Sequence, residues 1–293
     1  MKVRNIALAF GAAALILLMG SCDALFSNQF QSWGLGQVTN ATINDAVTNN
    51  DVAAILEQSG LEEGGISESF LNAATQDEET AAQVTEFLQQ TADNPETPPE
   101  TAQAARVIII EIELEMTGGR DFIDNIIAAV AGIDFNNLES FDLTDPDTAM
   151  SILNALFPPR QARLLPDGWT EEDMAALFND IYDLGDNVDA IIAALNANGL
   201  TYYVEGIDPG WIAQVGAAVR VLHLVQINAS FGTVGEALAA LVNDGTDNPD
   251  LINIADYITN SDTLLEEVRG DQGIMDLFMA AGWDLNALLP AVQ

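Results

Sequence analysis

The chain has 293 residues, of which 45 are acidic, eight are lysine or arginine and one is histidine, so its formal net charge at pH 7 is −37. This charge excludes nucleic acid as a partner, because phosphates must be neutralised by basic side chains, and it opposes contact with anionic lipid head groups. Hydrophobic residues make up 49% of the chain, which excludes a disordered acidic polypeptide and predicts a packed core.

The first 21 residues have the composition of an export signal. Lys2 and Arg4 supply positive charge, residues 6–19 form an apolar run, and Gly20 and Ser21 are small enough for a signal-peptidase site. The apolar run is shorter than the ~20 residues that a membrane-spanning helix needs. The pattern therefore favours a cleaved signal over a transmembrane anchor.

The only cysteine of the chain, Cys22, follows this leader directly. The sequence Met19-Gly20-Ser21-Cys22 resembles the lipobox of bacterial lipoproteins. The resemblance implies cleavage before Cys22, two acyl chains such as palmitate attached through its thiol, and usually a third on its amine. An ordinary secretory signal that leaves Cys22 as a free thiol is the alternative, but an unpaired exported thiol invites wrong pairing.

From this resemblance we expect a lipoprotein signal peptide at 1–21, a lipidated tether at 22–38 and a folded domain at 39–293, with a possible sub-boundary near 158–168. The protein would be held on a membrane by the lipid on Cys22 and would face the periplasm or the cell surface. The sequence leaves the choice between inner and outer membrane open.

Cleavage removes the only lysine and one arginine, so the mature chain keeps six arginines and all 45 acids, a net charge of −39. This charge is consistent with a cation-binding protein or with an adaptation to salty (halophilic) or alkaline surroundings, where carboxylates keep the surface hydrated. The absence of lysine extends along the whole mature chain, which favours the environmental interpretation. The sequence has no cysteine pair and no Cys/His set, and it predicts no metal and no cofactor.

Helix start and stop signals recur along the mature chain and predict an all-α fold, an array or bundle of about 12 short-to-medium helices. Thr170 with Asp173, and Thr233 with Glu236, have the spacing of capping boxes. The predicted helices cover residues 52–59, 77 or 80 to 91, 97–118, 144–158, 174–184, 187–198, 210–227, 233–245, 249–259, 262–268, 271–281 and 284–290.

Residues 110–115 alternate between apolar and acidic side chains, which is a strand pattern. We predict a helix there, because the segment lies between a proline-rich helix start and the double glycine 118–119. In that helix, one broad face is apolar and Glu111 and Glu115 lie together on the other.

Three predicted helix ends share a glycine four residues after a leucine, at Gly60, Gly199 and Gly245. The last two glycines lie 46 residues apart, which suggests a degenerate helical-repeat superhelix. Ordinary glycine caps on amphipathic helices explain the pattern equally well, and both explanations remain open.

His223 is the only histidine and lies in an apolar helix, three residues after Arg220. The two side chains could bind an anionic ligand. The competing interpretation, which we favour, is structural: His223 bonds a backbone carbonyl or an acid, and Arg220 pairs with a carboxylate. Separately, Tyr202, Tyr203 and Trp211 could form the mouth of a groove, and core packing or helix-end anchoring explains them equally well. Residues 244–250 partly resemble a calcium loop but lack the glycine and the final glutamate of the EF-hand pattern.

No catalytic residues can be nominated, because a serine-histidine-aspartate triad lacks its sequence context. We expect a non-enzymatic scaffold or transporter accessory that binds an envelope protein. In general style the chain resembles the helical lipoproteins of spirochaete-type envelopes, some of which serve transporters. The alternative is a periplasmic carrier of a small hydrophobic or amphipathic ligand, bound near residues 200–223.

Overall fold

The structure is a computed structural model that describes residues 38–61, 65–120, 170–197, 207–247, 254–261 and 263–281. The described residues form helices and no β-strand; an isolated antiparallel bridge joins Ile227 to Ile258. The predicted all-α fold is therefore confirmed. The signal peptide, the tether, the 158–168 sub-boundary and the predicted helices 144–158 and 284–290 lie outside the described residues.

The helices are short to medium in length. In chain order they are α3 (Asn40–Thr48), α4 (Val52–Ser59), α5 (Glu68–Ala74), α6 (Glu78–Asp93), α7 (Pro99–Thr117), α10 (Glu171–Asp183), α11 (Gly185–Ala197), α12 (Pro209–Leu224), α13 (Val234–Asp247), α14 (Leu264–Gly270) and α15 (Gln272–Ala280), with a 3₁₀ turn at Ile254–Asp256. None of these helices combines the length and the apolar character needed to cross a membrane.

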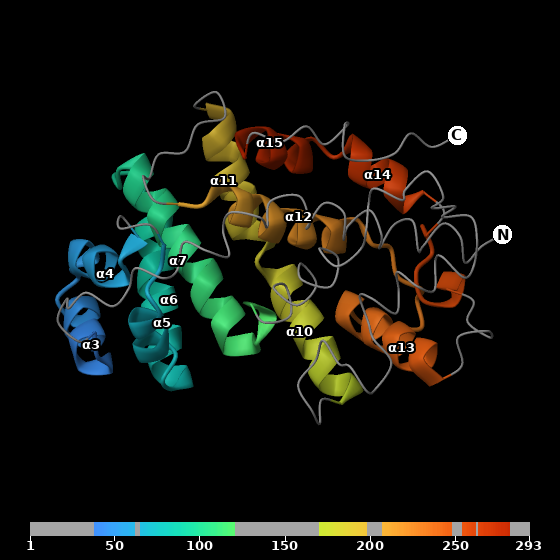
Figure 1. Ribbon diagram of the computed structural model, residues 1–293, viewed down its shortest axis with the longest axis horizontal. Helices are drawn as coiled ribbons and strands as arrows, with labels where there is room; N and C mark the ends of the chain where they lie inside the picture. The colour runs from blue at the N-terminus through green and yellow to red at the C-terminus, as the bar shows by residue number, and fades with distance from the viewer. Residues whose placement is uncertain are drawn as a thin grey trace, which may run out of the picture.

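Helix α7 is the centre of the fold. Figure 1 shows α3 to α6 on one side of it and α10 to α13 on the other. The predicted helix through 110–115 is confirmed, but the predicted division into an apolar and an acidic face is wrong. Glu111 is buried, and its carboxylate accepts a hydrogen bond of 3.0 Å from Arg120. The buried residues of α7 are Gln103, Ala104, Ala105, Val107, Ile108, Ile109, Ile110, Glu111, Ile112 and Leu114.

Several helix ends lie where their capping residues predict. The Asp51 carboxylate accepts a hydrogen bond from the backbone N–H of Ala54 at the start of α4. Gly60 and Gly118 end α4 and α7 with φ values of 74° and 71°, which only glycine adopts without strain. Thr170 and Asp173 form the predicted capping box of α10.

The end of α12 differs from the prediction, since the helix stops at Leu224 and not at residue 227. The side chain of Asn260, far along the chain, makes hydrogen bonds with backbone groups at the end of α12 that a further helical turn would otherwise satisfy. Its amide donates to the carbonyl of Leu224 (2.9 Å) and accepts from the N–H of Gln226 (3.0 Å). Ile227 then enters the bridge to Ile258. A partner so distant in sequence leaves no local signal.

Other predicted ends are also corrected. The predicted start of α13 is confirmed, since the Thr233 hydroxyl accepts from the N–H of Glu236 (3.2 Å), but the capping box is incomplete because the Glu236 carboxylate accepts from the N–H of Gly232 (2.7 Å). Helix α13 continues through Gly245 to Asp247, so the three glycines do not mark equivalent ends of a repeat. The predicted helix 249–259 is reduced, in its described part, to the 3₁₀ turn and the bridge, and the helix predicted at 262–268 begins at Leu264.

Helices α3 and α5 were not predicted. They are 9 and 7 residues long, and their starts are set by the hydroxyls of Thr39 and Ser67. Such short segments offer too few turns for a periodic pattern to stand out. Their apolar residues pack into the same core as α7, which supplies the stability that their length does not.

Helices α10 and α13 approach each other closely at Gly235. The backbone N–H of Gly235 donates to the Asn179 side chain (3.0 Å), and a Cβ added at Gly235 would lie 2.1 Å from the carbonyl oxygen of Ala175. A backbone atom cannot move aside as a side-chain tip can. The pairing of these two helices therefore requires glycine at this position.

We expect Gly235→Ala to lower the free energy of unfolding by about 3 kcal/mol, because the methyl group forces α13 away from α10. Gly270→Ala is the matched control. No atom lies within 4 Å of its added Cβ, so its stability should stay within about 0.5 kcal/mol of wild type. Urea unfolding followed by circular dichroism measures both, and a Gly235→Ala protein as stable as wild type would contradict the close approach.

Candidate functional site

Arg220 holds three helices together. Its guanidinium donates to both carboxylate oxygens of Asp271 (3.2 and 2.6 Å) and to Asp189 (2.7 Å), so α12 is joined to the start of α15 and to α11. Asp271 also caps α15 by accepting from the N–H of Ile274 (2.9 Å). The hydrogen bonds to Asp271 are the main reason why the pKa of Arg220 is raised. Arg220 therefore pairs with carboxylates, as the structural interpretation of this residue predicts.

His223, in the last turn of α12, packs against the turn between α10 and α11. Its Nε2 atom is 2.7 Å from the carbonyl oxygen of Tyr182, and the two rings stack with centroids 4.0 Å apart. The histidine ring covers Gly185, where an added Cβ would lie 2.2 Å from Cε1. A backbone carbonyl therefore engages His223, as the structural interpretation supposes.

The five residues predicted to bind a ligand are only partly described. Trp211 lies in the first turn of α12 and packs against the core. Arg220 and His223 contact different neighbours. Arg220 bonds to α11 and to the start of α15, whereas His223 contacts the turn between α10 and α11. Tyr202 and Tyr203 lie outside the described residues. Ligand binding by this group remains a prediction.

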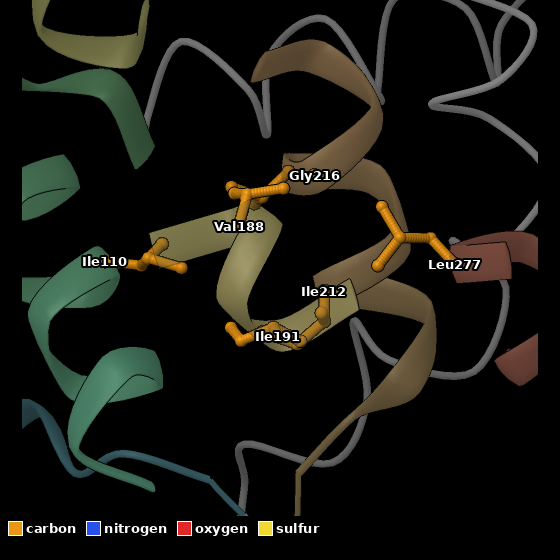
Figure 2. A pocket seen from close by; sticks show the side chains of 7 residues that line it. Ile110, Val188, Ile191, Ile212, Gly216 and Leu277 are labelled. Carbon is orange, nitrogen blue, oxygen red and sulfur yellow. The ribbon is translucent and has the colours of Figure 1, made fainter. Parts of the chain in front are cut away.

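A narrow apolar crevice lies where α7, α11, α12 and α15 meet (Figure 2). It is too narrow to hold a water molecule. Gly216 narrows it, because the absence of a side chain lets α12 approach Leu277 of α15. Trp211, Arg220 and His223 do not line it; the lining residues are Ile110, Val188, Ile191, Ile212, Val215, Gly216 and Leu277.

Acidic side chains show no arrangement suited to a metal ion within the described residues. In the segment that partly resembles a calcium loop, Asp244 accepts a hydrogen bond from the hydroxyl of Tyr257. This bond is the main reason why the pKa of Tyr257 is raised to about 12. Residues 244–247 belong to α13, so this part of the segment is helix and not loop.

Two half-buried carboxylates with raised pKa values, Glu113 on α7 and Asp180 on α10, were not anticipated. Burial is the main cause that raises the pKa of each; Asp180 adds to the rise at Glu113, and Asp183 adds to the rise at Asp180. The sequence does show Glu113 beside the isoleucines of α7. The strand-like alternation of this segment does not reveal which face of the helix Glu113 occupies.

Comparison of the chain with protein-family models, curated proteins and solved structures finds no match. The arguments for function therefore rest on the leader, the charge and the contacts of the described residues.

Arg220→Gln should lower the free energy of unfolding by about 2 kcal/mol, because it leaves the buried carboxylate of Asp271 without its charged partner. Asp189→Asn removes the negative charge of the other partner of the same guanidinium and keeps an oxygen that can accept its hydrogen bond. Its side chain is 52% exposed, against 7% for Asp271, so this change should cost less than about 1 kcal/mol. Chemical denaturation compares the two variants, and equal losses would refute the dominant role of Asp271.

Proposed function

We propose that the chain is a lipid-anchored protein of the bacterial envelope, whose helical domain acts without catalysis as a scaffold or transporter accessory for a protein partner. The leader and Cys22 support the anchor. The observation that supports a scaffold is the use of Arg220 and His223, the side chains best suited to ligand chemistry, to join α10, α11, α12 and α15.

The charge supports the environmental part of this proposal. Arginines whose side chains the structure describes are bonded to acids, so they leave little positive charge on the described surface. Carboxylates remain exposed at helix starts such as Glu171 and Glu172, where they also favour the helix dipole. Dissolved cations screen such a surface, which suits salty surroundings.

The anchor has a direct test, because cleavage would leave a mature chain with no lysine and no cysteine besides Cys22. Radiolabelled palmitate should enter the wild-type protein and not Cys22→Ser. A maleimide should fail to label the mature wild-type protein, because a thioether occupies the only sulfur that it could reach. An amine-reactive dye then distinguishes two acyl chains, which leave the α-amine free, from three, which block it.

A retained leader gives the opposite result. Lys2 and the α-amine of Met1 would react with the amine dye, and the thiol of Cys22 would react with the maleimide. That outcome, or equal palmitate labelling of wild type and Cys22→Ser, would refute the lipoprotein assignment.

The scaffold role predicts a partner of defined stoichiometry. A tagged wild-type protein, purified from native membranes in mild detergent, should elute with an envelope protein in a fixed ratio, identified by mass spectrometry. Cys22→Ser should lose most of this complex, because it leaves the membrane surface. A wild-type protein that elutes alone and carries a bound apolar small molecule would contradict the scaffold and favour the carrier.

A further inference from the structure

Two Asn-X-Ser/Thr triplets occur in the chain, at residues 40–42 and 228–230, and alanine is the middle residue of both. This triplet is the acceptor pattern for the attachment of sugars to asparagine in surface loops of exported proteins. Such a short pattern also arises by chance, so the environment of each asparagine must be compared. The two triplets lie in opposite environments.

The first asparagine, Asn40, is bonded to another helix. It is the first residue of α3. Its Nδ2 atom donates hydrogen bonds to the hydroxyl of Thr80 (2.6 Å) and to the carboxylate of Asp77 (3.2 Å). The hydroxyl of its triplet, on Thr42, donates to the carbonyl of Thr39 (2.8 Å) and so belongs to the helix start. The nitrogen that would carry a sugar is therefore occupied.

The second asparagine, Asn228, lies in the connection between α12 and α13 (Figure 1). A hydrogen bond from the N–H of Phe231 to the carbonyl of Asn228 (3.0 Å) closes a turn there. The tip of this turn, Ala229 and Ser230, is exposed. The N–H of Asn228 donates to the carbonyl of Tyr257 (2.9 Å), and the rings of Phe231 and Tyr257 stack. The turn is thus fixed at its base and open at its tip.

The Asn228 side chain forms its hydrogen bonds through oxygen. Its Oδ1 atom accepts from the backbone N–H of Ser230 (3.0 Å) and from the hydroxyl of Ser230 (3.1 Å). These bonds join the first and third residues of the triplet and hold the oxygen end of the planar amide against the turn. Nδ2 is at the opposite end, and no acceptor in the described part of the chain bonds it.

Attachment of a sugar would leave this turn intact. The product is a secondary amide that keeps Oδ1, the atom through which the Asn228 side chain holds the turn. At Asn40 the same reaction would replace one of the two Nδ2 hydrogens, and both are already used in bonds from α3 to α6. The folded structure therefore favours modification of Asn228 over Asn40.

We propose that Asn228 is an N-glycosylation site, used outside the cytoplasm by a membrane glycosyltransferase whose donor is a lipid-linked sugar diphosphate. Nδ2 forms a bond to the anomeric carbon of the sugar while the bond from that carbon to the diphosphate oxygen breaks. The lipid diphosphate leaves with the electron pair of that bond, and the amide nitrogen gives up one proton. This inference rests on the proposed export of the chain, because the triplet acts as an acceptor in exported proteins.

The test is a peptide analysis of the protein purified from its native membranes. Trypsin cleaves after arginine and lysine, and their scarcity leaves the two triplets on separate peptides. The first triplet lies on the peptide that ends at Arg106, and the second lies on residues 221–269. The 221–269 peptide should carry the added mass of one or more sugar residues, and fragmentation should locate that mass on Asn228.

Asn228→Asp is the decisive variant, because it keeps Oδ1 for the turn but has no amide nitrogen. The added mass should disappear in this variant. Ser230→Ala should also lose it, whereas Ser230→Thr keeps the hydroxyl and should retain it. Asn40→Asp is the matched control, and it should leave the sugar on the 221–269 peptide unchanged.

An unmodified 221–269 peptide in the wild-type protein, added mass that persists in Asn228→Asp, or a sugar on Asn40 would each overturn the inference. Palmitate labelling of the same material separates this result from the lipid anchor. A palmitate-labelled protein without sugar would overturn the glycosylation site alone. A protein that carries the sugar but no palmitate would overturn the anchor alone.

Discussion

The burial of α7 is the constraint on which the rest of the structure depends. A helix covered on nearly every side must satisfy its polar groups internally, because water reaches few of them. Its backbone does so through helical hydrogen bonds, but Glu111 needs Arg120, and Arg106 needs Asp93, Asn187 and the carbonyl of Ala92. The neighbouring helices are therefore placed both by the apolar surface of α7 and by the few polar atoms that it brings into the core.

Positive charge is scarce in this chain, and its placement follows from that scarcity. An exposed ion pair contributes little in water, whereas a partly buried one contributes more, because each partner would be costly to bury alone. Arg106 and Arg220 lie where helices from different parts of the chain meet, each with most of its side chain buried. The chain has 45 acids, and each arginine whose side chain the structure describes pairs with at least one of them.

Local chemistry made much of the fold predictable. Asp51, Thr170 and Gly118 fix helix ends through atoms within a few residues of themselves, so their roles are visible in the sequence. The failures have the opposite origin. The end of α12 depends on Asn260, and the capping-box partner expected for Thr233 bonds Gly232 instead. The need for glycine at position 235 arises from the carbonyl of Ala175 on another helix. Such tertiary contacts override local preference and have no short-range pattern.

The candidate site also combines features that the sequence reveals with contacts that only the fold reveals. Arg220 and His223 could be recognised as unusual in an apolar helix, and both interpretations of them could be written down from the sequence. The partners that the structural interpretation requires, Asp271 and the carbonyl of Tyr182, could be identified only from the structure. Glu113 was harder, because a carboxylate in an alternating segment looks exposed until the partner helix is known. A residue's chemistry is visible in the sequence, but its neighbours across the fold are not.

The charge of the domain also bears on how the protein could stay on a membrane. Peripheral proteins often combine one acyl chain with a polybasic segment, because a single chain gives only marginal, reversible binding. This chain has no lysine after residue 2, and anionic head groups would repel the net charge of −39 that the proposed cleavage would leave. If the protein is anchored as we propose, electrostatics would weaken its attachment and hydrophobic insertion would have to supply it. Two or three acyl chains on one cysteine would meet that requirement, and a single chain on Cys22 would not.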